Sequence, residues 1–160
     1  MNKDAINITR ADENDIDGIL SLLSQVLEIH AKIRPDLFIS GTTKYTKAEL
    51  VKMITDDSAP IFVARDKDQK VLGYAFCLLQ EESGVNLVPH KCLYIDDLCV
   101  DSSIRGLGIG RMLYDHVKDV AKALGCYDIT LNVWEGNDSA RHFYGSMGMG
   151  VKKTMMEEIL

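Results

Sequence analysis

The first third of the chain has a short strand pattern followed by two helical patterns. Apolar and polar side chains alternate over residues 6–10, which predicts a strand. Apolar residues then recur at helical spacing, and Pro35 should end that helix near Arg34 because proline disfavours the helical conformation of the residue before it. Residues 46–49 have the capping-box pattern that begins a second helix. The apolar positions of the first helix are Ile16, Ile19, Leu20, Leu23, Val26, Leu27 and Ile33.

After Pro60 the pattern changes to strands. The first two runs flank a polar turn at residues 66–70, which predicts a hairpin. A loop containing Gly84 and Pro89 should separate this hairpin from the next strand. The predicted strands are residues 61–64, 71–79, 92–100, 129–134 and 151–160.

Two further helices are predicted in the second half of the chain. One begins in a glycine-rich stretch near Gly110 and ends at Gly125. The other is capped by Asn137 or Asp138 and ends between residues 145 and 148. The resulting order is β, α, α, β, β, β, α, β, α, β. We therefore expect residues 1–160 to form a single mixed α/β domain.

Composition and charge disfavour several classes of protein. No stretch approaches the roughly 20 apolar residues that a membrane helix needs, and the polar N-terminus does not resemble a signal peptide. A net charge of −6 disfavours nucleic-acid binding. Cys77, Cys92, Cys99 and Cys126 lie in apolar runs without a C-x-x-C pair or a histidine at ligand spacing. We expect a cytoplasmic protein with reduced thiols, no metal site and no membrane contact.

Residues 100–113 have the pattern of an anion site. A predicted strand ends, Gly106, Gly108 and Gly110 follow, and a helix begins. Glycines allow successive backbone N–H groups to point into one concavity, and the helix N-terminus adds unpaired N–H groups and a partial positive charge. Arg105 and Arg111 add further positive charge. The segment therefore suits a phosphate or pyrophosphate.

The spacing of these glycines excludes two common phosphate motifs. A P-loop needs a Gly-Lys-Ser/Thr sequence, which does not occur in the chain. A dinucleotide fingerprint would need its third glycine at Arg111 or Leu113. Asp128 lies at the distance of the fingerprint's acidic residue, but it precedes a predicted strand instead of ending one. A nucleotide-binding oxidoreductase is therefore disfavoured.

The spacing that fits is R-x-x-G-x-G, formed by Arg105, Gly108 and Gly110, and here the chain resembles the GNAT superfamily of acyl-CoA N-acyltransferases. A second stretch resembles the superfamily's N-x-x-A-x-x-F-Y-x-x-x-G signature. Residues 93–100 are similar to its central strand. The resemblance spans essentially the whole chain and is strongest over residues 93–149. The matching positions of the second signature are Asn137, Ala140, Phe143, Tyr144 and Gly148.

The resemblance implies a GNAT-like fold: a mostly antiparallel sheet of six to seven strands, splayed at the acyl-CoA site, with about four helices. It also implies acetyl-CoA as the co-substrate and no metal. The pantetheine arm would pair with the strand end formed by Leu98, Cys99 and Val100, and Asn137 would hydrogen-bond it. The pyrophosphate would lie on the loop formed by Arg105, Gly106, Leu107, Gly108, Ile109, Gly110 and Arg111.

The chemistry implied is direct attack of an amine on the thioester. Tyr144 matches the tyrosine that protonates the departing thiolate. Asp96 or Asp97 would be the general base, with Asp96 preferred and acting through a water. Neighbouring residues on a regular strand face opposite sides, so only one would face the substrate unless a bulge intervenes. A nucleophilic role for Cys99 is disfavoured because no histidine is tied to it.

The acceptor is less defined than the co-substrate. His30, Arg34, Phe38 and Tyr45 lie where relatives wall the acceptor site. The acidic charge and the aspartate pair favour a small cationic amine, and the resemblance equally admits a protein N-terminus or an aminoglycoside. A homodimer through the C-terminal strand is also compatible with the resemblance. The alternative function is a non-catalytic module that binds or senses acyl-CoA, which would need neither Tyr144 nor an acid.

Overall fold

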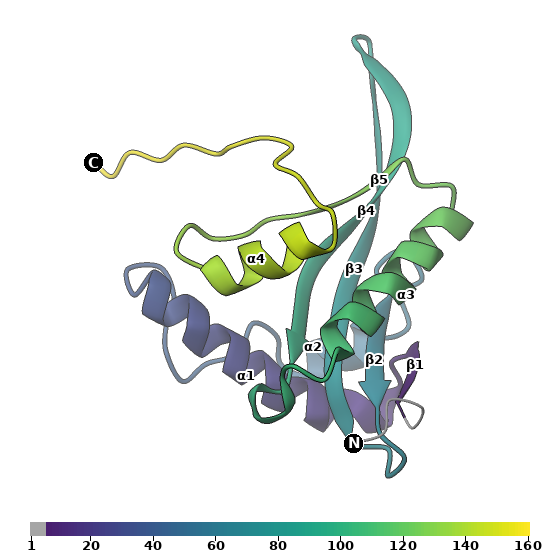
Figure 1. Cartoon of the computed structure of the whole chain (residues 1–160), viewed down its shortest axis with the longest axis vertical. Helices are drawn as coiled ribbons and strands as arrows, with labels where there is room; N and C mark the ends of the chain where they lie inside the picture. The colour runs from purple at the N-terminus through teal and green to yellow at the C-terminus, as the bar shows by residue number, and fades with distance from the viewer. Residues whose placement is uncertain (1–5) are drawn as a thin grey trace.

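The structure, a computed structural model, describes residues 6–160. Its sheet has the order β1-β2-β3-β4-β5, and neighbouring strands are antiparallel except β4 and β5, which are parallel (Figure 1). The strands are β1 (Asn7–Arg10), β2 (Ile61–Arg65), β3 (Val71–Gly84), β4 (Leu87–Val100) and β5 (Asp128–Leu131). The helices are α1 (Ile16–Ile33), α2 (Lys47–Met53), α3 (Ile109–Ala123) and α4 (Asp138–Ser146), with short 3-10 turns η2 (Glu13–Asp15) and η3 (Ser102–Ile104). The predicted mixed α/β class is confirmed.

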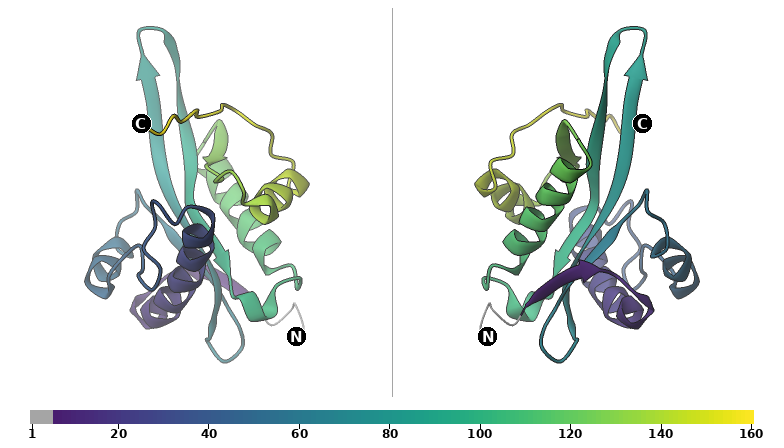
Figure 2. Two further views of the ribbon diagram at one scale, coloured as in Figure 1. Left: turned by 90° about the vertical axis from the view of Figure 1, so that its left-hand side faces the viewer. Right: turned by 90° about the vertical axis from the view of Figure 1, so that its right-hand side faces the viewer.

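The helices cover both faces of the sheet. Figure 2 shows α1 and α2 on one side, and α3 and α4 on the other. The alternation of side chains along β3 explains this arrangement. Tyr74 and Phe76 pack into the hydrophobic cluster with α1, whereas Ala75 and Cys77 pack into the cluster with α3. The sheet therefore lies between two hydrophobic layers.

The predicted count of six to seven strands is wrong for residues 6–160, which form five. Residues 151–160, expected as the last strand, run as an extended tail that joins no sheet. Ion pairs hold this tail: Lys152 Nζ lies 2.7 Å from the Asp128 carboxylate, and Glu157 lies 2.7 Å from the Arg34 guanidinium. The edge strand β5 is only 4 residues long and offers little backbone for a further strand to pair with.

A long two-stranded arm replaces the loop expected around Gly84 and Pro89. Here β3 runs to Gly84 and β4 begins at Leu87, so the two strands project beyond the rest of the sheet (Figure 1). Glu82 pairs with His90 and Gly84 pairs with Leu87, which leaves one extra residue on β4. Pro89 lies in this irregularity, where a missing N–H donor is tolerated.

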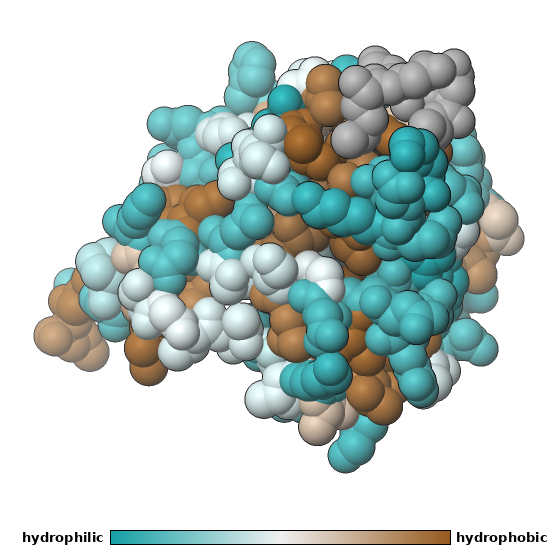
Figure 3. Space-filling view, turned by 90° about the horizontal axis from the view of Figure 1, so that it is seen from below, coloured by the Kyte–Doolittle hydropathy of each residue, from teal (hydrophilic) through white to brown (hydrophobic). Residues whose placement is uncertain are grey.

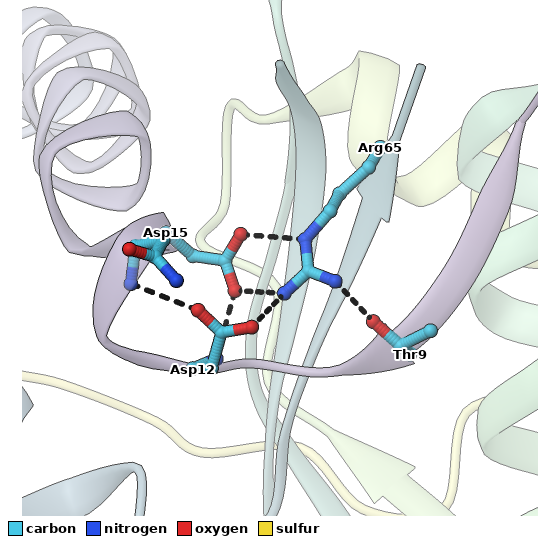
Figure 4. A network of polar contacts seen from close by, with 5 residues as sticks. Thr9, Asp12, Asp15 and Arg65 are labelled. Atoms are coloured by element: carbon cyan, nitrogen blue, oxygen red, sulfur yellow. Dashed lines mark hydrogen bonds and ion pairs between the residues drawn. The ribbon is translucent and has the colours of Figure 1, made fainter. Parts of the chain in front are cut away.

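Arg65 at the end of β2 ties the start of α1 to the sheet (Figure 4). Its guanidinium donates hydrogen bonds to Asp15 at 2.7 Å, to Asp12 at 2.8 Å and to Thr9 Oγ1 at 2.9 Å. Asp12 and Asp15 also form the capping box of η2. The Asp15 side chain is 2% exposed and that of Arg65 is 12% exposed, so this is a buried ion pair. Loss of either partner would leave a buried charge uncompensated.

The surface combines hydrophilic residues with separate hydrophobic patches, as Figure 3 shows for the side seen from below. Exposed apolar side chains include Val85 and Val88 on the arm and Met155, Met156 and Leu160 in the tail. Within the described part of the chain, no helix combines the length and apolar character required to span a bilayer.

Candidate active site

A β-bulge interrupts β4 at the adjacent carboxylates. Phe76 pairs with Asp97, but the next residue of β3, Cys77, pairs with Ile95, so Asp96 is the extra residue. A bulge locally disrupts the ladder and re-aims side chains. The sequence predicted that Asp96 and Asp97 could face the same side of the sheet only if a bulge separated them from the regular pleat, and this bulge is present.

The bulge turns both carboxylates toward the face covered by α1 and α2. Ile95 packs into the α3 cluster before the bulge, and Leu98 packs into the same cluster after it. In a regular strand, side chains on one face are two residues apart. Ile95 and Leu98 are three residues apart, so they can share a face only because the bulge adds one residue. Asp97 consequently reaches Tyr74, which belongs to the α1 cluster.

Asp96 is held from the segment between α1 and α2. Lys44 Nζ donates to Asp96 Oδ2 at 2.6 Å, and the Tyr45 hydroxyl donates to the same oxygen at 3.0 Å. Burial opposes the charged form of Lys44, but the hydrogen bond to Asp96 and its charge raise the lysine pKa above its ordinary value. The ring of Tyr45 also stacks on Phe76 at 5.6 Å, which fixes its hydroxyl over the bulge. Asp96 thus binds an ammonium group and remains 29% exposed.

Asp97 has a different environment. It accepts a hydrogen bond from the Tyr74 hydroxyl at 2.8 Å. Burial raises the pKa of Asp97 to about 6, and the neighbouring Asp96 charge adds to the effect, against the opposing Tyr74 hydrogen bond and Lys44 charge. A carboxyl group with a pKa near the working pH is suited to proton exchange. The two aspartates therefore offer one ion-pairing group and one readily protonated group.

Beyond Ile95, β4 has β3 on one side and an open edge on the other. The pairing with β5 ends at Ile95 and Leu131, whereas β3 continues opposite Leu98, Cys99 and Val100. An open edge can accept an extended ligand that carries amides. Cys99 itself is 3% exposed, and burial raises the pKa of its thiol to about 12. Such a thiol is a core group and not an activated nucleophile.

The glycine loop joins this open edge to the N-terminus of α3. Gly106 and Gly108 have φ values of +84° and +83°, a region that favours glycine, and Gly108 is the N-cap of α3. No side chain caps this helix start, so its first N–H groups are open to a ligand. A Cβ at Gly110 would lie 3.3 Å from the Phe143 ring, so its glycine allows α4 to pack closely. The buried Ile109 anchors the helix start, and Arg105 and Arg111 are exposed beside it.

Tyr144 and Asn137 both come from α4. Asn137 is the N-cap, and its Oδ1 accepts a hydrogen bond from the Ala140 amide at 3.2 Å, which leaves the side-chain NH2 as a donor. Tyr144 lies with its ring centre 6.4 Å from that of Tyr114. Burial, with the Asp97 charge adding to it, raises the pKa of Tyr144 well above its usual range. The phenol therefore stays protonated and can act as an acid.

The residues predicted to wall the acceptor site form two groups. His30 lies 5.2 Å from Phe38 between ring centres, and Phe38 meets Trp134 edge-on at 5.4 Å. Burial lowers the pKa of His30, and the charge of Lys44 adds to this effect. Tyr45 contacts the Lys44–Asp96 pair. Arg34 lies over Trp134 at 5.8 Å, but its guanidinium is engaged by Asp36 and Glu157.

Sequence reasoning missed Lys44, Tyr74 and Trp134. Lys44 meets Asp96 across 52 positions of sequence, and Tyr74 meets Asp97 across 23. No local pattern marks such contacts. Trp134 was placed in a strand, although β5 ends at Leu131. The available signal was that Trp134 is the chain's single tryptophan and lies just before the second signature. Among residues 6–160, no group of three or more His, Cys, Asp or Glu side chains is arranged to hold a metal ion.

The chain is similar to known acetyltransferases in sequence. The model of the acetyltransferase (GNAT) family matches residues 23–149. The peptidyl-lysine N-acetyltransferase YjaB of Salmonella typhimurium is 36% identical over 108 residues, which cover 66% of this chain and 61% of that protein. A glucosamine 6-phosphate N-acetyltransferase of Dictyostelium discoideum is 27% identical over 84% of this chain and 80% of its own. The chain spans less than two thirds of the length of the YjaB relative.

A solved structure is similar over nearly the whole chain. A mutant of the BH1408 protein from Bacillus halodurans has a TM-score of 0.92 and 32% identity, and the match covers 96% of this chain and 99% of that one. The overall fold of this chain therefore matches one already seen by crystallography.

Proposed function

This chain belongs to the GNAT acetyltransferase family, and we propose that it transfers the acetyl group of acetyl-CoA to the primary amine of a cationic acceptor. The observation that carries the proposal is the Lys44 ammonium held 2.6 Å from Asp96, which lies where the open edge of β4 begins. A carboxylate that already binds an amine beside a ligand-accepting edge has the arrangement that amine acetylation requires.

The fit to acetyl-CoA rests on the edge and the loop. The pantetheine amides would pair with the backbone of Leu98, Cys99 and Val100, which has β3 on its other side. The pyrophosphate would lie on the amides of residues 105–111, at the uncapped N-terminus of α3. An added Cβ at Gly106 would have no atom within 4 Å, so the loop surface there is open. The Asn137 NH2 group would bind the pantetheine.

The chemical step divides between the two sides of β4. The acceptor amine loses a proton to Asp96, through a water, and its nitrogen attacks the thioester carbonyl. The carbon–nitrogen bond forms, the carbon–sulfur bond breaks, and the second proton on the nitrogen passes to solvent. Tyr144 donates its proton to the departing CoA thiolate, which its raised pKa keeps available. A backbone amide near Cys99 or Val100 would stabilise the developing oxyanion.

Asp96 is the preferred base because it contacts the ammonium of Lys44 and is partly exposed. Asp97 is the alternative, since its pKa of about 6 matches a proton acceptor working near neutral pH. The pH dependence of kcat/KM distinguishes them. If Asp96 is the base, Asp96→Asn abolishes the acidic limb and Asp97→Asn preserves it, whereas the opposite pattern assigns the base to Asp97.

The acceptor should be a cationic amine, either a small amine or an amino group on a protein. The net charge of −6 and the carboxylates on this face support that class. The name of the Salmonella relative, a peptidyl-lysine N-acetyltransferase, supports a protein amine. An anionic acceptor such as glucosamine 6-phosphate is disfavoured, because the guanidinium of Arg34, which is expected to wall the acceptor site, is already paired with Asp36 and Glu157.

Thiol release from acetyl-CoA with a panel of amines tests the proposal. The panel should contain polyamines, a lysine peptide with a blocked N-terminus, a peptide with a free N-terminus and glucosamine 6-phosphate. Turnover is expected with a cationic member and should fall about 10²-fold or more in Tyr144→Phe. Tyr127→Phe, at a residue that is 82% exposed, is the matched control. Calorimetric binding of CoA in preference to ATP and NAD, without turnover of any amine, would instead favour the acyl-CoA-binding module.

The proposal also treats residues 1–160 as one catalytic domain working in the cytosol. Four unpaired cysteines support that location, since thiols stay reduced there. The exposed apolar residues of the tail support a homodimer, which sedimentation would test.

A further inference from the structure

Lys44 places its amine on Asp96, the carboxylate proposed above as the general base. Its Nζ lies 2.6 Å from Asp96 Oδ2, and its side chain is 42% exposed, so the amine is bound but accessible. The Tyr45 hydroxyl donates to the same oxygen, and the Lys44 ammonium lies 5.4 Å from the Tyr45 ring centre. A carboxylate, a hydroxyl and an aromatic face together form a site for a protonated primary amine. In this structure, the chain's own lysine fills that site.

The segment that carries Lys44 is fastened at two points. The Glu28 carboxylate accepts hydrogen bonds from the Ser40 hydroxyl at 2.8 Å and from the Gly41 amide at 2.6 Å. Four positions later, Lys44 and Tyr45 contact Asp96. The backbone is therefore held while the flexible lysine stem is free to move its amine along β4. Asp96 lies two residues before Leu98, about 7 Å along a strand, which is within the reach of that stem.

A nearby lysine provides the contrast. Lys47, at the start of α2, pairs with Asp17 at 2.8 Å and is 63% exposed. It is more accessible to solvent than Lys44, and its partner lies in the first turn of α1 instead of in the bulge of β4. Random chemical acetylation would therefore favour Lys47, whereas catalysis at Asp96 would favour Lys44.

We propose that Lys44 is an internal acceptor, which the enzyme acetylates in cis. This inference rests on the proposed function. The Lys44 ammonium gives one proton to Asp96, and the freed nitrogen attacks the thioester of acetyl-CoA bound to the same chain. The new amide bond replaces the carbon–sulfur bond, the tetrahedral nitrogen's second proton passes to solvent, and the thiolate takes its proton from Tyr144. Acetylation removes the positive charge, so the ion pair with Asp96 is lost and the carboxylate is released to external amines.

Peptide mass spectrometry of the purified chain incubated with acetyl-CoA tests this proposal. The arms are the wild type, Lys44→Arg, Lys47→Arg and Asp96→Asn, each at several protein concentrations. We expect one acetyl group on Lys44 with a first-order rate constant that does not depend on protein concentration. The rate should fall about 10²-fold or more in Asp96→Asn and be unchanged in Lys47→Arg. In Lys44→Arg, acetylation should not transfer to Lys47.

Four results would overturn the proposal. Lys44 that stays unmodified while external amines are acetylated would refute the internal acceptor and leave the proposed function standing. Equal modification of Lys44 in the wild type and Asp96→Asn would assign the product to uncatalysed chemistry. A rate constant that rises with protein concentration would assign it to transfer between copies. The absence of both Lys44 modification and CoA release with any amine would refute the proposed function as well.

Discussion

Replacing Asp97 by asparagine should stabilise the protein above neutral pH, even though Asp97 lies in the candidate active site. Burial raises the pKa of this carboxyl group from 3.8 to about 6. Between these two values the unfolded chain releases the proton while the folded chain keeps it. Folding stability therefore falls as the pH rises through this window, and the loss is complete above about pH 6.

The magnitude follows from the two pKa values. A difference from 3.8 to about 6, at about 1.4 kcal/mol for each pH unit, destabilises the ionised folded state by at most about 3 kcal/mol. Asp97 keeps partial solvent access, so the measured value should lie below this limit. Asparagine carries no charge, and its Oδ1 can still accept the Tyr74 hydrogen bond. The penalty is therefore removed without losing the contact.

Urea denaturation of the wild type and Asp97→Asn from pH 4 to pH 8 measures this effect. The difference in unfolding free energy should be small near pH 4 and should grow in favour of the variant up to about pH 7. Asp101→Asn is the control of opposite sign, because hydrogen bonds from the Ser103 amide and hydroxyl lower the pKa of Asp101. That variant should lose stability at neutral pH. A pH-independent difference for Asp97→Asn, or a less stable variant at pH 8, would refute the reasoning.

Three further substitutions test separate parts of the structure. Gly108→Val should cost about 1–2 kcal/mol in urea denaturation and weaken CoA binding in calorimetry, because φ is +83° at the N-cap of α3; unchanged binding would argue against the loop as the pyrophosphate site. Arg65→Met should cost about 3–5 kcal/mol by leaving the buried Asp15 carboxylate without its partner; a loss under 1 kcal/mol would show that Asp15 finds another donor. Cys99→Ala should keep turnover in the thiol-release assay, since the thiol is buried with a pKa of about 12; an inactive but folded variant would restore a covalent role.

Local patterns predicted the helices better than the sheet. The capping box at Thr46 and Glu49 forms as expected, because the donors and acceptors involved lie within one turn. Residues 151–160 are predicted as a strand, but strand pairing also needs a free edge of sufficient length, which the 4-residue β5 does not provide. The arm was hidden because Gly84 and Pro89 normally indicate a loop, and only the register of β3 against β4 shows that Pro89 lies in a bulge.

The same limit applies to the site. Both aspartates could be found from sequence, because they form an adjacent acid pair in the segment that resembles the central strand of the superfamily. The different environments of Asp96 and Asp97 could not be predicted, because they depend on contacts with Lys44, Tyr45 and Tyr74, which belong to other elements. The bulge at Asp96 is likewise a property of strand pairing and has no signature within β4 alone.

The bulge restricts which changes of chain length the protein can accept. The extra residue decides which side chains after the bulge face each side of the sheet. Deleting Asp96, or inserting one residue between Ile95 and Leu98, would therefore move the side chains of one half of β4 to the opposite face. Either the core side chains before the bulge or the carboxylates and the open strand edge after it would then face the wrong layer. By contrast, the polar turn at residues 66–70 and the projecting tip of the arm make no such demand. Natural length variation among relatives should therefore gather at those two turns, and engineered insertions should be placed there.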